Sequence, residues 1–114
     1  MKAFLINPLD ETITEVDHDD SDYKNISKAI DAKYFTTVQI HEDGDTIYLD
    51  DEGLLHGNHK HTFTLDKVFG QTFVGKGLVL GTNMRNGDAK DVDCTLDDLK
   101  NRIEFNKLQI YMRG

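Results

Sequence analysis

The sequence predicts an α+β fold, with a largely antiparallel sheet of about five to seven strands and two short helices. Three observations support this fold class. The chain has 114 residues, the size of one domain. Short β-branched and aromatic runs alternate with clusters of turn residues, which is typical of antiparallel strands. Two further segments place apolar residues at helical spacing. Because no linker or internal repeat divides the chain, residues 1–114 are expected to form a single domain.

The first two strands are predicted at residues 3–6 and 12–16, which are both β-type runs. Between them lie Asn7, Pro8 and Asp10, residue types that favour turns. Since the connection is short and rich in turn residues, the two runs are expected to pair with each other as an N-terminal hairpin.

The first helix is predicted directly after the acidic stretch 17–22. Tyr23, Ile26 and Ile30 follow at i, i+3 and i+7, the spacing of one apolar helix face. The preceding carboxylates offer several N-caps and suit the positive end of a helix dipole. Part of the acidity of this stretch therefore has a structural explanation.

A second hairpin is predicted at residues 36–40 and 46–49, around the turn pair at 43–44, which is the strongest hairpin signal in the chain. Residues 62–65 and 72–80 are predicted to form further strands. Glycines at 70, 75 and 77 interrupt this part of the chain. They indicate bulges or sharp bends.

Residues 82–91 form a predicted polar loop, and a second helix is predicted over 96–104. Thr95 begins a capping-box pattern in which Asp98 replaces the usual Glu. The apolar stripe of this helix consists of Leu96, Leu99 and Ile103. Residues 108–112 alternate well enough to predict a final strand.

The charge balance excludes several classes of function. The net charge is −8, and the first 55 residues hold 14 acids against four bases. No basic footprint for a nucleic acid is visible. No run approaches the ~20 apolar residues of a membrane span, and the N-terminal apolar run is too short for a signal peptide. The single cysteine, Cys94, excludes an internal disulfide. We expect a cytoplasmic protein without a cofactor.

Three histidines lie within six residues, at His56, His59 and His61, just after an acidic run. Imidazole and carboxylate groups are ligands of first-row metals. In a strand beginning near residue 59, His59 and His61 would share one face, and His56 would approach from the loop. The three residues are therefore a candidate metal site. The alternative is an exposed polar loop without a metal, and Gly57 and Asn58 favour it.

No enzyme is predicted. The acid pairs lie mostly in turns or at helix starts, where solvation and capping explain them better than general acid/base catalysis. The segment 75–81, GKGLVLG, resembles a phosphate-binding loop but lacks the upstream glycine and the Ser or Thr after Lys76 that a P-loop requires. Cys94 precedes a predicted helix start but has no evident histidine partner.

Four phrases of the sequence together resemble a family of small phage-encoded proteins of unknown function. They are MKAFLINP with TITEV at the start, DTIYLDDEGLL at 45–55, VGKGLVLGT at 74–82 and TLDDLKNRIEF at 95–105. The resemblance implies an accessory protein made in the cytoplasm of an infected bacterium. It brings no catalytic residues that match positions in this chain.

Two classes of function are open. In the first, the chain is a non-enzymatic accessory protein that binds and modulates a host or phage protein, in host takeover or against a defence system. Its acidic half would form the interaction face, with mimicry of DNA in a basic groove as a stronger version. An acidic surface that only keeps the protein soluble predicts the same charge. The candidate protein-binding residues are Asp17, Asp19, Asp20, Asp22, Asp43, Asp45, Asp50, Asp51 and Glu52.

In the second class, the chain binds or sequesters a small ligand, such as a nucleotide signal or a metal. A homo-oligomer would then be expected, because one small domain offers little concavity. The candidate anion contacts are Gly75, Lys76, Gly77, Arg85 and Lys90. A small hydrolase that uses the histidines is the third and weakest interpretation.

Overall fold

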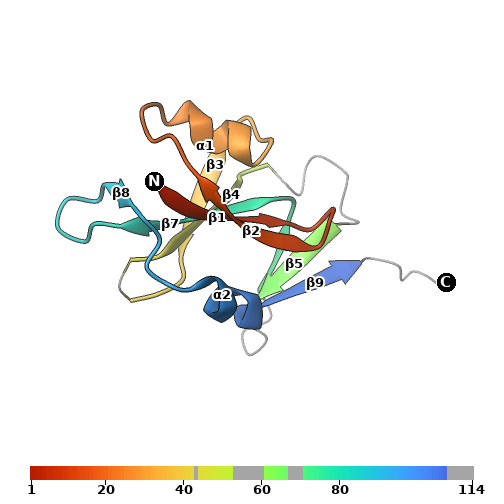
Figure 1. The fold of residues 1–114 in the computed structure, drawn as a ribbon. Helices are drawn as coiled ribbons and strands as arrows, with labels where there is room; N and C mark the ends of the chain where they lie inside the picture. The colour runs from red at the N-terminus through yellow and green to blue at the C-terminus, as the bar shows by residue number, and fades with distance from the viewer. Residues whose placement is uncertain (43, 53–60, 67–70, 108–114) are drawn as a thin grey trace.

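The structure is a computed structural model that describes residues 1–42, 44–52, 61–66 and 71–107. Nine strands and two helices lie in these ranges (Figure 1). In chain order they are β1 (Lys2–Asn7), β2 (Thr12–Asp17), α1 (Lys24–Ala29), β3 (Phe35–Gln39), β4 (Thr46–Asp50), β5 (His61–Leu65), β6 (Gln71–Val74), β7 (Gly77–Thr82), β8 (Ala89–Lys90), α2 (Leu96–Arg102) and β9 (Ile103–Lys107).

The predicted α+β class is confirmed, and every strand pairing is antiparallel. The strands are divided between two sheets. The larger has the order β2-β1-β7-β4-β3, with β8 also paired to β7, and the smaller has the order β6-β5-β9. The chain passes from the smaller sheet to the larger at Gly75, whose φ of 85° is readily adopted by glycine. Both predicted hairpins are present, as β1 with β2 and β3 with β4.

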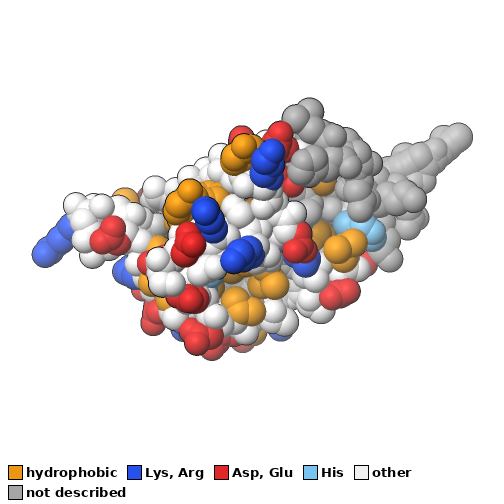
Figure 2. Space-filling view, turned by 90° about the horizontal axis from the view of Figure 1, so that it is seen from above, with side chains coloured by type: hydrophobic (Ala, Val, Ile, Leu, Met, Phe, Trp, Pro, Cys, Tyr) orange, Lys and Arg blue, Asp and Glu red, His pale blue; other side chains and the backbone are white. Residues whose placement is uncertain are grey.

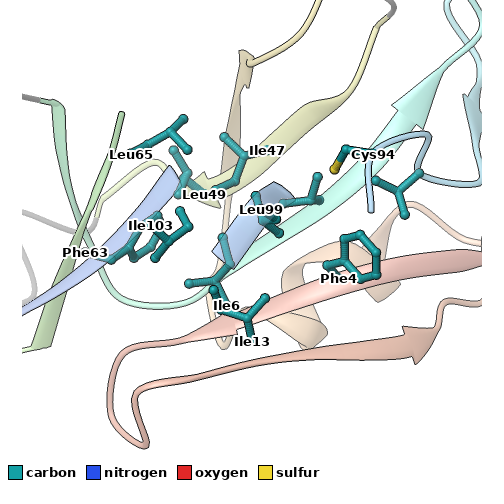
Figure 3. Close-up of a cluster of buried hydrophobic side chains, with 12 residues drawn as sticks. Phe4, Ile6, Ile13, Ile47, Leu49, Phe63, Leu65, Cys94, Leu99 and Ile103 are labelled. Carbon is teal, nitrogen blue, oxygen red and sulfur yellow. The ribbon is translucent and has the colours of Figure 1, made fainter. Parts of the chain in front are cut away.

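Each face of the larger sheet covers a separate apolar core. On one face, Ile26 and Ile30 of the α1 region pack with Leu78 and Leu80 of β7. On the other face, Val79 of β7 joins the larger core, which α2 and the smaller sheet close (Figure 3). Side chains of successive β7 residues alternate between the two faces. This central strand therefore contributes to both cores.

Gly77 shows how closely the two sheets approach. A Cβ atom at this position would lie 2.8 Å from Cδ1 of Ile47 and 3.2 Å from Cζ of Phe63. Ile47 belongs to β4 and Phe63 to β5, so the contact joins the two sheets. The residue is a packing requirement of the core and not a flexible point in a strand.

The second helix is shorter than predicted. α2 ends at Arg102, and Ile103 has extended backbone angles of φ −104° and ψ 134°. Ile103 is instead the first residue of β9, where it pairs with Leu65 of β5. The prediction of helix at 103–104 was wrong because burial of Ile103 in the core is equally compatible with a strand. The predicted strand at 108–112 lies outside the described residues.

The predicted N-cap of α2 is confirmed, since the Thr95 side chain accepts a hydrogen bond of 3.1 Å from the Asp98 N–H.

Among the described residues, no helix is long and apolar enough to span a membrane.

Candidate functional site

Four exposed aspartates lie at the end of β2 and before α1, and we call Asp17, Asp19, Asp20 and Asp22 the acidic segment. The start of this segment is hydrogen-bonded to the N-terminus. The terminal ammonium group of Met1 donates a hydrogen bond of 2.7 Å to Oδ1 of Asp17. This bond lowers the pKa of Asp17 below its usual value. The backbone of the buried residue His18 also exchanges hydrogen bonds with Met1. The segment therefore leaves β2 from a fixed position.

Two of these carboxylates hold the local backbone in turns. Oδ1 of Asp19 accepts the Ser21 N–H at 2.9 Å, and Oδ1 of Asp22 accepts the Lys24 N–H at 2.9 Å. The first bond lowers the pKa of Asp19. Asp22 thus satisfies the N–H of the first residue of α1, although the N-cap position itself is Tyr23, whose side chain makes no capping bond. The carboxylates stay exposed while their backbone is ordered.

Exposed aromatic side chains lie beyond both ends of α1. Tyr23, which directly follows the acidic segment, is 69% exposed, and Tyr34, beyond the other end of the helix, is 56% exposed. Nζ of Lys33 lies 5.4 Å from the centre of the Tyr34 ring. Tyrosine is enriched among the residues that dominate protein interfaces. Tyr23 therefore places an apolar anchor beside a group of negative charges.

Three other predicted acids belong to a different element. Asp50, Asp51 and Glu52 are at the end of β4, and the Asp51 N–H donates to the carbonyl of Tyr34 at 3.2 Å. Asp50 and Glu52 are only partly exposed. Figure 2 looks down on the α1 side, where red side chains gather at the lower left and blue and orange ones lie among the rest. On this face the acids of the described residues are therefore interspersed with basic and apolar side chains, and DNA mimicry stays a prediction.

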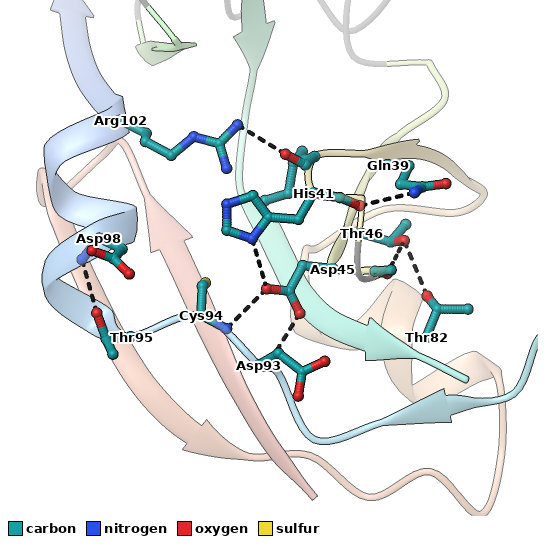
Figure 4. Close-up of polar contacts among 12 residues, drawn as sticks. Gln39, His41, Asp45, Thr46, Thr82, Asp93, Cys94, Thr95, Asp98 and Arg102 are labelled. Carbon is teal, nitrogen blue, oxygen red and sulfur yellow. Dashed lines mark hydrogen bonds and ion pairs between the residues drawn. The ribbon is translucent and has the colours of Figure 1, made fainter. Parts of the chain in front are cut away.

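Asp45 was wrongly predicted to belong to the interaction face. Its side chain is fully buried, at 0% exposure. One oxygen accepts the Asp93 N–H at 2.9 Å, and the other accepts the Cys94 N–H at 2.9 Å (Figure 4). The carboxylate supplies these backbone donors with partners, which is why it can be buried. Its neighbour Asp43 lies outside the described residues.

His41 contacts the same carboxylate, with Nδ1 at 3.2 Å from Oδ2 of Asp45. Gln39, Ile40, His41 and Glu42 line an open depression of about 270 Å³. An Asp–His pair can polarise an imidazole for proton transfer. The nearby thiol, Cys94, is buried, and burial followed by the charge of Asp45 raises its pKa to about 12. The thiol therefore stays protonated at neutral pH.

A second polar contact adjoins this pair. Nε and Nη2 of Arg102 donate to the two oxygens of Asp66, at 2.7 and 2.5 Å, and Nη2 also donates to the Ile40 carbonyl at 3.0 Å. These bonds lower the pKa of Asp66. Arg102 thereby connects α2 to the end of β5 and to the end of β3. Sequence reasoning missed this cluster, although His41 and Asp45 flank the predicted turn at 43–44 and a hairpin brings such residues together.

The candidate metal site falls largely outside the described residues. His56 and His59 lie outside the described residues. His61 is a partly exposed residue at the start of β5 and pairs with Lys107 of β9. Across the ranges that the structure describes, no group of three or more His, Cys, Asp or Glu residues is arranged to hold a metal. The three-histidine site stays a prediction.

The predicted anion contacts do not converge within one chain. Gly75 forms the turn before β7, and Lys76 is ion-paired with Asp31 at 2.5 Å. Gly77 is buried in β7 between β1 and β4. At the far end of this strand, Arg85 is exposed in the following loop and Lys90 pairs with Asp93 at 2.9 Å. A strand of this length spans about 17–20 Å, so the two groups of residues cannot share a small ligand within one chain, and their assembly across an oligomer interface stays a prediction.

The chain was compared with known proteins. A family model described as Domain of unknown function (DUF3846) matches residues 1–104. No curated protein and no solved structure matches the chain. The family match carries no activity, so function is inferred from the residues themselves.

Proposed function

The chain belongs to the DUF3846 family, and we propose that it is a non-enzymatic phage accessory protein that binds and modulates a host or phage protein. The acidic segment and Tyr23 form the proposed contact surface. Its partner presents basic side chains, and the encounter takes place in the cytoplasm of an infected bacterium. The phage origin rests on the resemblance of the four sequence phrases given above.

One observation carries this proposal: four exposed carboxylates are held on an ordered backbone beside an exposed tyrosine. Tyr23 is 69% exposed, and its ring would be buried by a partner, while the carboxylates would form a charged rim. Charge of one sign accelerates the encounter with a basic partner and makes binding sensitive to salt. An acidic surface that serves only for solubility requires neither the ordered backbone nor the tyrosine.

Two polar groups of the interior have structural explanations. The buried carboxylate of Asp45 has backbone partners on both oxygens, and the Cys94 thiol is held in its protonated form by a pKa of about 12. The surface around α1 also supports general protein binding better than DNA mimicry, because Lys24 and Lys28 of the helix follow the acidic segment.

The proposal can be tested by affinity capture with three baits at low salt. The first is the natural chain. The second carries Asp19→Asn, Asp20→Asn and Asp22→Asn, which remove three charges but keep the oxygens that accept the Ser21 and Lys24 N–H groups. The third, a matched control, carries Glu15→Gln, Asp88→Asn and Asp97→Asn, which remove three exposed charges elsewhere.

A protein that the natural chain and the control retain, and that the second bait loses, is the expected result. A captured protein that all three baits retain equally would contradict the role of the acidic segment. Loss of the same protein from both variants would also contradict it, since total charge rather than this surface would then control binding.

A further inference from the structure

The outer edge of the larger sheet is formed by β3. This strand is last in the order β2-β1-β7-β4-β3, and β4 is its pairing partner among the described residues. One side of its backbone therefore faces away from the sheet. Such an edge is a template for pairing with another strand.

The hydrogen bonds at both ends of the hairpin show which residues face outward. The Ile40 N–H donates to the Asp45 carbonyl at 2.8 Å, and the Asp51 N–H donates to the Tyr34 carbonyl at 3.2 Å. Bonding residues alternate along an antiparallel pair. Even-numbered residues of this stretch therefore bond to β4, and Phe35, Thr37 and Gln39 direct their N–H and C=O groups to the outside.

The β3 edge lacks the usual protection against pairing. Edge strands normally carry charges, a proline or a bulge. β3 reads FTTVQ, and its register with β4 is continuous over all five residues. The opposite edge differs, because β2 carries Glu15 and Asp17 and packs against α2. Thr37 and Gln39 of β3 are exposed.

We propose that β3 pairs antiparallel with β3 of a second copy of this chain, around a two-fold axis at Thr37. Thr37 then lies opposite Thr37 of the second copy, and Phe35 lies opposite Gln39. The outward residues of each strand meet the outward residues of the other, as an isologous interface requires. The six-stranded sheet becomes continuous across both copies.

Charge complementarity favours a second copy as the occupant of this edge. Lys33 precedes β3 and Glu42 follows it, and both side chains are exposed. Antiparallel pairing brings the Lys33 end of each copy to the Glu42 end of the other, and symmetry gives this contact twice. β3 itself carries no charge, so the paired strands place no like charges opposite each other.

The dimer also has a consequence for the surface beside α1. A two-fold axis through paired edge strands runs perpendicular to the sheet, so α1 of both copies lies on the same side of the joined sheet. Two acidic segments would then face one direction, and a partner with two basic sites would bind with increased avidity. Formation of the dimer requires no partner protein, so its test is independent of the proposed function.

The oligomeric state tests this proposal, measured by sedimentation velocity of the full chain from about 1 μM to about 1 mM because the interface is short. The natural chain is expected to pass from monomer to dimer over this range. Thr37→Pro removes an outward N–H without removing a bond to β4, so it is expected to give a folded monomer. Thr36→Pro is the matched control: it removes a bond to β4 and is expected to destabilise the monomer itself.

Charge reversal provides a second test that does not depend on a proline. Lys33→Glu and Glu42→Lys are each expected to weaken the dimer by roughly 2- to 30-fold, and the double variant is expected to restore it. A natural chain that stays monomeric at about 1 mM would overturn the proposal. So would a dimer that neither charge reversal nor Thr37→Pro weakens.

Discussion

The buried carboxylate of Asp45 accepts the backbone N–H of Cys94 across a sequence separation of 49 residues, at 2.9 Å. Its other oxygen accepts the N–H of Asp93. Asp45 directly precedes β4, while Cys94 lies in the segment that leads to α2. The Asp45 side chain therefore links the start of β4 to the segment that leads to α2.

Asp45→Asn is expected to lower the free energy of unfolding by about 2–4 kcal/mol, because an amide places a donor where the carboxylate accepted a second N–H. Urea denaturation measures this loss. Asp88→Asn, at an exposed position, is the control and is expected to change stability by less than about 0.5 kcal/mol. Equal stability of the two variants would show that Asp45 does not hold this connection.

The hairpin around Asp45 could be predicted from the sequence, but the burial of its side chain could not. The hairpin of β3 and β4 was predictable because β-branched runs flank a turn pair, and both signals are local. The burial of Asp45 was not predictable, since the donors that compensate it come from residues far along the chain. An acid beside a turn has the same local pattern whether it is solvated, like Asp51, or buried, like Asp45.

The acidic segment illustrates the opposite case. Its position before a helix followed from local spacing, and the structure confirms it. The predicted N-cap was wrong, because the N-cap position of α1 is Tyr23, without a capping side chain, and Asp22 instead accepts the Lys24 N–H. The predicted anion contacts at 75–77 and at 85 and 90 lie at opposite ends of β7, which is a central strand of the larger sheet. Their assembly across an oligomer interface stays a prediction.

The Cys94 thiol is expected to react with a disulfide reagent only when the chain unfolds. Its side chain is buried and its pKa is raised to about 12, so the reactive thiolate is nearly absent at pH 8. The rate of modification should be far below that of a free thiol in the native protein and should approach it in urea. Rapid modification of the folded chain at pH 8 would contradict this placement of the thiol.

Removal of the Asp66 charge is expected to reduce stability in a pH-dependent manner. Arg102 lowers the pKa of Asp66 in the folded state, so the ionised carboxylate stabilises the fold above its unfolded pKa of about 3.9, and this contribution is lost as the pH falls through the folded pKa. Asp66→Asn should therefore cost about 1–3 kcal/mol at pH 7.

The difference in the free energy of unfolding between the natural chain and the Asp66→Asn variant should shrink below about pH 4. At this pH the Asp66 carboxyl becomes neutral, as the Asn side chain is at every pH. Urea unfolding at several pH values measures both curves. A difference that stays constant from pH 7 to about pH 3 would indicate a packing effect and not the ion pair with Arg102.

Gly77→Ala is expected to cost about 1–3 kcal/mol, because its Cβ would lie 2.8 Å from Cδ1 of Ile47 in a closed core. Ile47→Val removes that Cδ1 atom, so the double variant should lose less stability than the sum of the two single variants. If the double variant loses as much stability as the two single variants together, the contact between Gly77 and Ile47 is not the source of the cost.

The affinity of the captured protein for the three baits tests the central claim most directly. Calorimetric titration at two salt concentrations should give at least about tenfold weaker binding for the variant of Asp19, Asp20 and Asp22 than for its matched control, with the difference reduced at high salt. Equal affinity of the two variants at low salt would contradict a contact surface at the acidic segment.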